Sequence, residues 1–171
     1  MERPGEVTFQ GQPLTLIGPR LKEGDAAPEF ELLANDLSAV KLSDSAGKVR
    51  LIAAVPSLDT PVCDLETRTF NQRLDAFGGR VFGYTVSADL PFAQARWCGA
   101  AGVKNMQTLS DHREMAFGGA YGTHIKELRL ESRAVFVVDG EGVIRYVEYV
   151  GEITNAPDYN AALDALNKLL A

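Results

Sequence analysis

One strand–helix–strand segment constrains the fold most strongly. Residues 49–55 form a nearly continuous apolar run of strand length, which is typical of a strand covered on both faces. Thr60 and Pro61 then supply a helix start, and a Gly-Gly pair ends that helix. Residues 80–86 supply the next strand. Two strands joined by a helix pair in parallel with a right-handed crossover, so the segment predicts an α/β fold.

The remaining segments add strands and helices on both sides of this unit. We expect an N-terminal hairpin within residues 1–18, short strands at 30–33 and 40–42, helices from Pro91 to Cys98 and from Asp111 to Phe117, a hairpin of residues 133–138 and 143–150, and a C-terminal helix that begins at Asp158. Together they predict one domain, residues 1–171, in which helices flank a central mixed sheet and the N-terminal hairpin is an added part.

The charge balance excludes two classes of partner. The chain has 17 basic and 23 acidic side chains, and its formal net charge is −6. Nucleic-acid binders need a basic patch to neutralise phosphates, and none is visible, so neither a nucleic acid nor an anionic membrane is expected as a partner. No apolar run approaches the ~20 residues of a membrane helix, and the first ten residues lack a secretory apolar segment. We therefore expect a cytoplasmic protein.

The chain contains only two cysteines and two histidines. Cys63 and Cys98 do not form a C-x-x-C pair, which argues against a zinc ribbon and against a thioredoxin-type dithiol. His112 and His124 lack the spacing of metal ligands, and we expect both to lie at the surface. The sequence therefore predicts no metal site.

Cys63 is the candidate reactive residue. With Thr60 as N-cap, Cys63 is the third helical residue, close to backbone N–H groups that have no intrahelical acceptor. That environment favours the thiolate form of a cysteine, and it lies at the carboxyl edge of the sheet, where α/β proteins place their sites. The alternative is that Cys63 is a small core residue, because free cysteine is among the most buried residue types.

The residues around Cys63 resemble the peroxiredoxin family. Residues 56–63 read P-S-L-D-T-P-V-C, which matches the family pattern P-x-x-x-T-x-x-C. Further segments resemble the thiol peroxidase subfamily, the atypical two-cysteine type: F-N at 70–71, S-A-D-L-P-F-A-Q-A-R-W-C at 87–98, R-A-V-F-V-V-D at 133–139 and P-D-Y-N-A-A-L at 157–163. The resemblance spans nearly the whole chain. Its departures, Val55 before Pro56 and a loose match after Ala120, involve no reacting group.

The resemblance implies a thioredoxin-like fold and a thioredoxin-dependent peroxidase. Cys63 would attack hydrogen peroxide or an organic hydroperoxide and become a sulfenic acid, which Cys98 would resolve as an intrachain disulfide. Arg133 would lie beside the Cys63 sulfur, Thr60 would hydrogen-bond the peroxide, and Pro56 would shield the site. The resemblance further implies a homodimer, reduction by thioredoxin, an antioxidant role in redox homeostasis, and no metal, haem or flavin.

Several interpretations remain open on the residues alone. Thr60 can act only as a helix cap, Arg133 can be a solvated strand end, and Cys98 can be an ordinary helix residue. Other functions are a cysteine hydrolase that pairs Cys63 with a histidine, a peroxide-responsive redox sensor or binding protein without multiple turnover, and a disulfide oxidoreductase. Asp59, Asp89 and Arg96 either shape the site or serve only capping and solvation.

Overall fold

The computed structural model describes residues 1–171, and its elements alternate between strands and helices. In chain order they are β1 (Glu2–Phe9), β2 (Gln12–Ile17), β3 (Glu31–Leu33), β4 (Ala39–Lys41), η1 (Leu42–Ser45), β5 (Val49–Ala54), α1 (Pro61–Arg73), η2 (Leu74–Phe77), β6 (Val81–Ser87), α2 (Pro91–Ala101), β7 (Met106–Ser110), α3 (Ala116–Tyr121), β8 (His124–Ile125), β9 (Leu130–Glu131), β10 (Ala134–Val138), β11 (Ile144–Tyr149) and α4 (Tyr159–Leu170).

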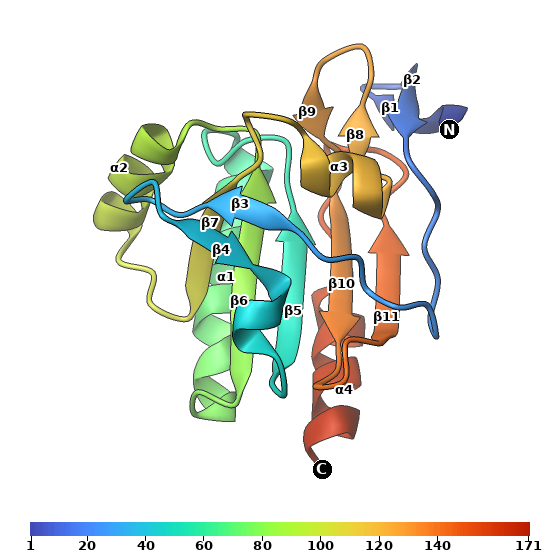
Figure 1. The fold of residues 1–171 in the computed structure, drawn as a ribbon. Helices are drawn as coiled ribbons and strands as arrows, with labels where there is room; N and C mark the ends of the chain where they lie inside the picture. Colours follow the sequence, from blue (N-terminus) through green and yellow to red (C-terminus); the bar gives the residue numbers. More distant parts are fainter.

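The strands form one large mixed sheet and one small sheet (Figure 1). The large sheet has seven strands in the order β11-β10-β5-β6-β7-β3-β4, and the small one has the order β1-β2-β8-β9. The β5–α1–β6 unit is present as expected, with β5 and β6 parallel from Val49–Val81 to Ala54–Val86. The predicted mixed α/β sheet with flanking helices is therefore confirmed.

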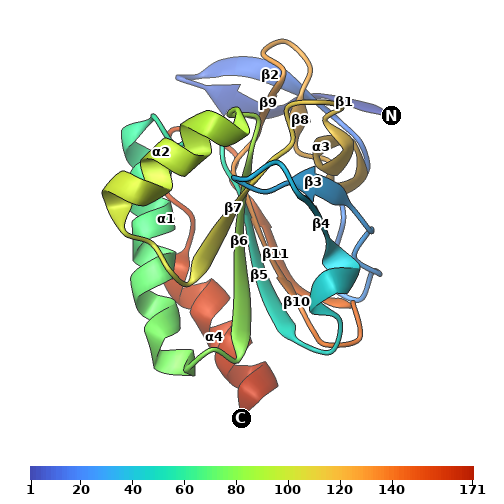
Figure 2. The ribbon, with the colours of Figure 1, turned by 60° about the vertical axis from the view of Figure 1, so that its left-hand side comes forward.

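Side chains alternate between two apolar layers along the central strands. Leu51 and Ala53 face α1 and α4, in a cluster that includes Phe70 and Leu166. Ile52 and Ala54, which alternate with these residues along β5, face the opposite layer. That layer also contains apolar side chains from β3, η1 and α3. Figure 2 shows α1, α2 and α4 together on one side of the sheet, with α3 on the other. The continuous apolar run of β5 thus reflects burial on both faces.

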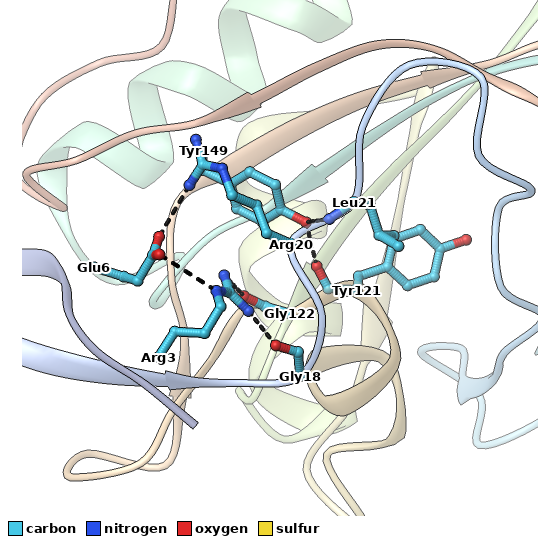
Figure 3. A network of polar contacts seen from close by, with 8 residues as sticks. All are labelled: Arg3, Glu6, Gly18, Arg20, Leu21, Tyr121, Gly122 and Tyr149. Atoms are coloured by element: carbon cyan, nitrogen blue, oxygen red, sulfur yellow. Dashed lines mark hydrogen bonds and ion pairs between the residues drawn. The ribbon is translucent and has the colours of Figure 1, made fainter. Parts of the chain in front are cut away.

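The N-terminal hairpin forms as predicted, but it belongs to the small sheet. Polar contacts attach it to the rest of the chain (Figure 3). Arg3 donates to the carbonyl oxygens of Gly18 and Gly122, and Glu6 pairs with Arg20, whose guanidinium lies 4.9 Å from the ring centroid of Tyr149. Under the hairpin, four apolar side chains form a separate buried cluster: Val7, Leu16, Ile125 and Ile153.

The region between residues 104 and 131 departs most from the expectation. The sequence patterns missed β7, β8 and β9, of which the last two have only two residues each. The expected helix from Asp111 to Phe117 was wrong in its bounds, because the helix runs from Ala116 to Tyr121 and passes through Gly118 and Gly119. Asp111 still caps the start of this helix, because its carboxylate accepts hydrogen bonds from the N–H groups of Phe117 and Gly118.

A second carboxyl group lies buried beside Asp111. Glu131 is fully buried and accepts a hydrogen bond from the hydroxyl of Thr123. Burial raises the pKa of Glu131 well above its usual range, and the hydrogen bond to Asp111 and the charge of Asp111 act in the same direction. The folded environment therefore favours the protonated form of Glu131.

No helix in the structure combines the length and the apolar character that crossing a bilayer requires.

Candidate active site

Cys63 occupies the first turn of the helix that follows the buried strand β5. Helix α1 begins at Pro61, so Cys63 is its third residue, as the sequence predicts. Its side chain is fully buried and packs with Val55 and Leu58, against which Trp97 also lies. The thiol therefore lies at the carboxyl end of β5. The first N–H groups of α1, which have no acceptor within the helix, lie beside it.

The register of β10 brings Arg133 to this thiol. Strand β10 runs antiparallel to β5, and Ala134 pairs with Ala54, the last residue of β5. Arg133 directly precedes Ala134, so it lies at the same edge of the sheet as the start of α1. Its Nη2 donates to Cys63 Sγ over 3.3 Å. Arg133 is buried, which excludes the alternative that it is a solvated strand end.

Two further acceptors hold the Arg133 guanidinium. Its Nη1 donates to Glu66 Oε1 at 3.0 Å, and its Nε and Nη2 both donate to the carbonyl oxygen of Ile153, at 3.1 and 2.8 Å. Glu66 lies one helical turn after Cys63, so both side chains face the same way from α1. The guanidinium is thus fixed in one orientation against the sulfur.

Burial and charge act in opposite directions on this ion pair. Burial raises the pKa of Glu66 to about 7, although the Arg133 guanidinium acts to lower it. Burial would also lower the pKa of Arg133, but the charges of Cys63 and Glu66 outweigh it and the net pKa of Arg133 is raised. The arginine therefore stays positively charged beside the thiol.

Thr60 is the N-cap residue by position, but its side chain does not cap the helix. The Thr60 hydroxyl makes no hydrogen bond to a first-turn N–H and instead donates to the carbonyl oxygen of Ser57 at 2.9 Å. The expectation of a side-chain cap is therefore wrong. With its only proton directed at Ser57, the half-buried hydroxyl keeps its lone pairs free to accept.

The loop between β5 and α1 is attached to the start of α2 by Asp89. One carboxylate oxygen of Asp89 accepts from the Ser57 hydroxyl at 2.7 Å, and the other accepts from the Leu58 N–H at 2.8 Å. Pro56, in the same loop, is buried. Asp89 therefore shapes the loop that carries Pro56 and Thr60, which the sequence left undecided.

Cys98 is a separate free thiol on α2. It is half-buried, and its Sγ lies 3.2 Å from Thr108 Oγ1 on β7. The neighbouring Trp97 donates from Nε1 to Asp64 on α1 at 2.7 Å. No disulfide joins Cys63 and Cys98, and each sulfur has its own polar partner.

Neither histidine hydrogen-bonds the Cys63 sulfur, which a cysteine hydrolase would require. Both are half-buried rather than at the surface, and burial lowers the pKa of His124. No group of three or more acidic, histidine or cysteine side chains could hold a metal ion.

Sequence reasoning missed Glu66 and Ile153. The spacing of three residues from Cys63 could have indicated Glu66, because side chains at i and i+3 share a helix face. Ile153 contributes only its backbone carbonyl, which no sequence pattern identifies.

A buried cysteine at a helix start, held by a buried arginine on a mixed sheet, defines a thiol-based redox protein of the thioredoxin-like class. The sequence profile of the Redoxin family matches residues 22–163. The chain belongs to this family.

Individual relatives narrow this class to a peroxiredoxin-type thiol peroxidase, an oxidoreductase. The chain is 56% identical over 164 residues to the thiol peroxidase of Halalkalibacterium halodurans, covering 96% of this chain and 98% of that protein. It is 53% identical over 165 residues to the thiol peroxidase of Bacillus subtilis, with the same two coverages. The crystal structure of a peroxiredoxin-like protein from Aquifex aeolicus superimposes with a TM-score of 0.90 at 38% identity, covering 98% of this chain and 99% of that one.

Proposed function

We propose that the chain is a thioredoxin-dependent thiol peroxidase that reduces organic hydroperoxides and hydrogen peroxide. One observation carries the proposal: Arg133 Nη2 donates to the sulfur of Cys63, a buried cysteine in the first turn of a helix. A fixed positive charge and helix N–H groups both favour the thiolate, which is the nucleophilic form of cysteine.

In the first step, the Cys63 thiolate attacks one oxygen of the hydroperoxide. The sulfur–oxygen bond forms, the O–O bond breaks, and the departing oxygen takes a proton and leaves as alcohol or water. Arg133 and the helix N–H groups stabilise the charge that moves onto the departing oxygen. Thr60, whose proton is directed at Ser57, accepts the hydrogen bond of the peroxide O–H. Buried Pro56 keeps water from the reacting atoms.

In the second step, Cys98 resolves the sulfenic acid on Cys63. The Cys98 sulfur bonds to the Cys63 sulfur, and the hydroxyl leaves with the thiol proton as water. Both cysteines lie on helices and have different partners, so an end of α1 or α2 unwinds before the sulfurs meet. Thioredoxin then reduces the disulfide by thiolate exchange.

Intact mass under non-reducing conditions tests the cycle. One equivalent of cumene hydroperoxide is added to the fully reduced protein. We expect a loss of two hydrogens that maps to a Cys63–Cys98 link, and its reversal by a bacterial thioredoxin with NADPH and thioredoxin reductase. A gained oxygen without the link would remove Cys98 from the cycle, and no rapid change would refute the peroxidase mechanism.

Two variants separate the roles of the cysteines. Cys63→Ser should lose all peroxidase activity. Cys98→Ser should reduce one equivalent of peroxide and then stall with thioredoxin. A sensor without multiple turnover, the alternative function, would show no sustained NADPH consumption even in the unmodified protein.

The site and the family also support three broader proposals. We propose that residues 1–171 fold as one domain, act in the cytoplasm, and form a homodimer, as peroxiredoxins typically do. Leu90 and Phe92, at the start of α2, are 52% and 67% exposed and supply apolar surface that a dimer could cover. Analytical ultracentrifugation of the reduced protein tests the dimer, and a monomer at micromolar concentration would contradict it.

A further inference from the structure

The thiol of Cys98 is the first member of a directed hydrogen-bond relay. Its Sγ lies 3.2 Å from Thr108 Oγ1, and Thr108 Oγ1 donates to Asn35 Oδ1 at 2.8 Å. A hydroxyl has a single proton, and an amide oxygen can only accept. Because the Thr108 proton goes to Asn35, the Cys98 thiol must be the donor to Thr108.

This direction makes the relay specific for a protonated thiol. In the S–H form, Cys98 satisfies a lone pair of the buried Thr108 hydroxyl and attaches α2 to β7. A Cys98 thiolate would face the same lone pair without a donor, because the Thr108 hydroxyl donates its only proton to Asn35 Oδ1. While Cys98 carries its proton, the relay therefore favours the docked position of α2.

The other contacts of α2 do not depend on the thiol. Trp97 donates to Asp64, and Arg68 lies over the Trp97 ring, so the charged side chains that meet α2 from α1 are engaged there. Gln94 donates to Ser87 and to a backbone carbonyl of β7. Only the relay through Thr108 responds to the state of the Cys98 sulfur.

We propose that Thr108 and Asn35 are positioning residues for Cys98, which hold its thiol docked on β7 and thereby set how fast it leaves β7 to resolve the Cys63 sulfenic acid. The inference rests on the proposed function, in which Cys98 is the resolving cysteine. In that step the Cys98–Cys63 bond forms, the Cys63 S–O bond breaks, and water leaves with the thiol proton. Slow release would leave the sulfenic acid open to a second peroxide and to overoxidation.

The first experiment measures the relay without any peroxide chemistry. In a Cys63→Ser background Cys98 is the only thiol, and its alkylation by iodoacetamide is followed against pH. Asn35→Ala removes the acceptor that orients the Thr108 hydroxyl, so the Cys98 thiol loses its directed partner and we expect alkylation at pH 7 to rise about tenfold. In a Thr108→Val background the same Asn35 change should have no effect, and Thr108→Ser should behave like the unmodified chain.

Thr85→Val is the matched control. Thr85 lies on β6, the strand next to β7, where it pairs in register with Thr108. The buried hydroxyl of Thr85 has no hydrogen-bond partner. The same loss of a hydroxyl there should leave Cys98 alkylation unchanged. An Asn35→Ala effect that persists without the Thr108 hydroxyl would overturn the relay, and so would an Asn35→Ala effect matched by Thr85→Val.

The second experiment measures resolution in chains that retain both cysteines. After one equivalent of cumene hydroperoxide, we expect Asn35→Ala and Thr108→Val to form the disulfide several-fold faster, and to give less sulfinic acid at high peroxide, with an unchanged rate of Cys63 oxidation. Equal disulfide rates would overturn the inference alone. No Cys63–Cys98 disulfide in any chain would overturn the proposed function and the rate-setting role together.

Discussion

The guanidinium of Arg133 donates hydrogen bonds to three acceptors at once, which a lysine side chain could not do in the same geometry. Cys63, Glu66 and the Ile153 carbonyl oxygen approach it from α1 and from the segment after β11. A planar fork of N–H groups can meet acceptors in different directions without moving, whereas a lysine ammonium is a single point charge on a flexible stem. The site therefore depends on the shape of the cation as well as on its charge.

Arg133→Lys tests this dependence. We expect the second-order rate of peroxide reaction at Cys63 to fall roughly 100-fold, the usual effect of removing one donor to a developing negative charge. Stopped-flow fluorescence of Trp97 provides the measurement, because Trp97 packs against the Cys63 cluster. Arg145→Lys, at an exposed ion pair with Asp139, is the control, and an equal rate in both variants would contradict the argument.

Glu66 makes the stability of the fold depend on pH. Its pKa is raised from 4.5 to about 7, so between these values the unfolded chain releases a proton that the folded chain retains. Stability therefore falls as pH rises from 4.5 to 7, and levels off above 7, by about 3 kcal/mol from this group. Urea unfolding should show this decline relative to Glu66→Gln, whose amide oxygen can still accept from Arg133.

Glu114→Gln supplies the comparison for that measurement, because Glu114 is exposed. It should retain the full decline between pH 4.5 and 7. Parallel stability curves for the unmodified chain and for Glu66→Gln would show that Glu66 titrates as an ordinary carboxyl.

At the scale of elements, the local signals at the start of α1 were reliable, whereas strand register was not foreseen. The start of α1 depends on Thr60 and Pro61, which are adjacent, so the sequence predicted it and the place of Cys63. The expected side-chain cap by Thr60 was wrong, because its hydroxyl donates to an acceptor in the preceding loop, although Thr60 is the N-cap residue by position. The contacts of Arg133 with Glu66 and Ile153 depend on how β10 and β11 align at the sheet edge, and no local pattern encodes that alignment.

At the end of α3, Gly122 lies in tight backbone contact with Pro19. Gly122 has φ +73°, and an added Cβ would collide with the carbonyl oxygen of Pro19, where the connector passes from the hairpin to the large sheet. Gly122→Ala should therefore lose roughly 3 kcal/mol or more of stability, measured by thermal unfolding. Gly5→Ala, at φ +70° with nothing within 4 Å, should lose only about 1 kcal/mol. Equal losses would mean that the conformation alone, not the contact, is costly.

At the scale of the whole molecule, the N-terminal hairpin supports the site from a distance. Leu16 of the hairpin packs with Ile153, whose carbonyl oxygen accepts from Arg133. The sequence patterns predicted the hairpin as an added part, but this route from β2 to Cys63 follows only from the fold. Reduction by thioredoxin stays a prediction, because no contact described identifies the reductant.

Leu16→Ala should therefore impair both stability and reactivity. We expect a loss of about 3 kcal/mol from the cavity, together with a slower reaction of Cys63 with peroxide as Ile153 shifts. Leu166→Ala creates a comparable cavity under α4, where the side chain is also fully buried, and should lose stability without slowing the reaction. The rate of the Cys63 reaction with peroxide is measured for both variants well below their unfolding temperatures. A slower reaction in Leu16→Ala alone shows that the hairpin supports the site, whereas equal rates in the two variants would contradict this.

The buried pair of Asp111 and Glu131 also changes what folding does to the surrounding solution. Burial raises the pKa of Glu131 well above its value in the unfolded chain, so the folded chain binds a proton there more tightly. At pH values between the two pKa values, folding therefore takes up protons from the buffer, and the native protein carries less negative charge than the unfolded chain.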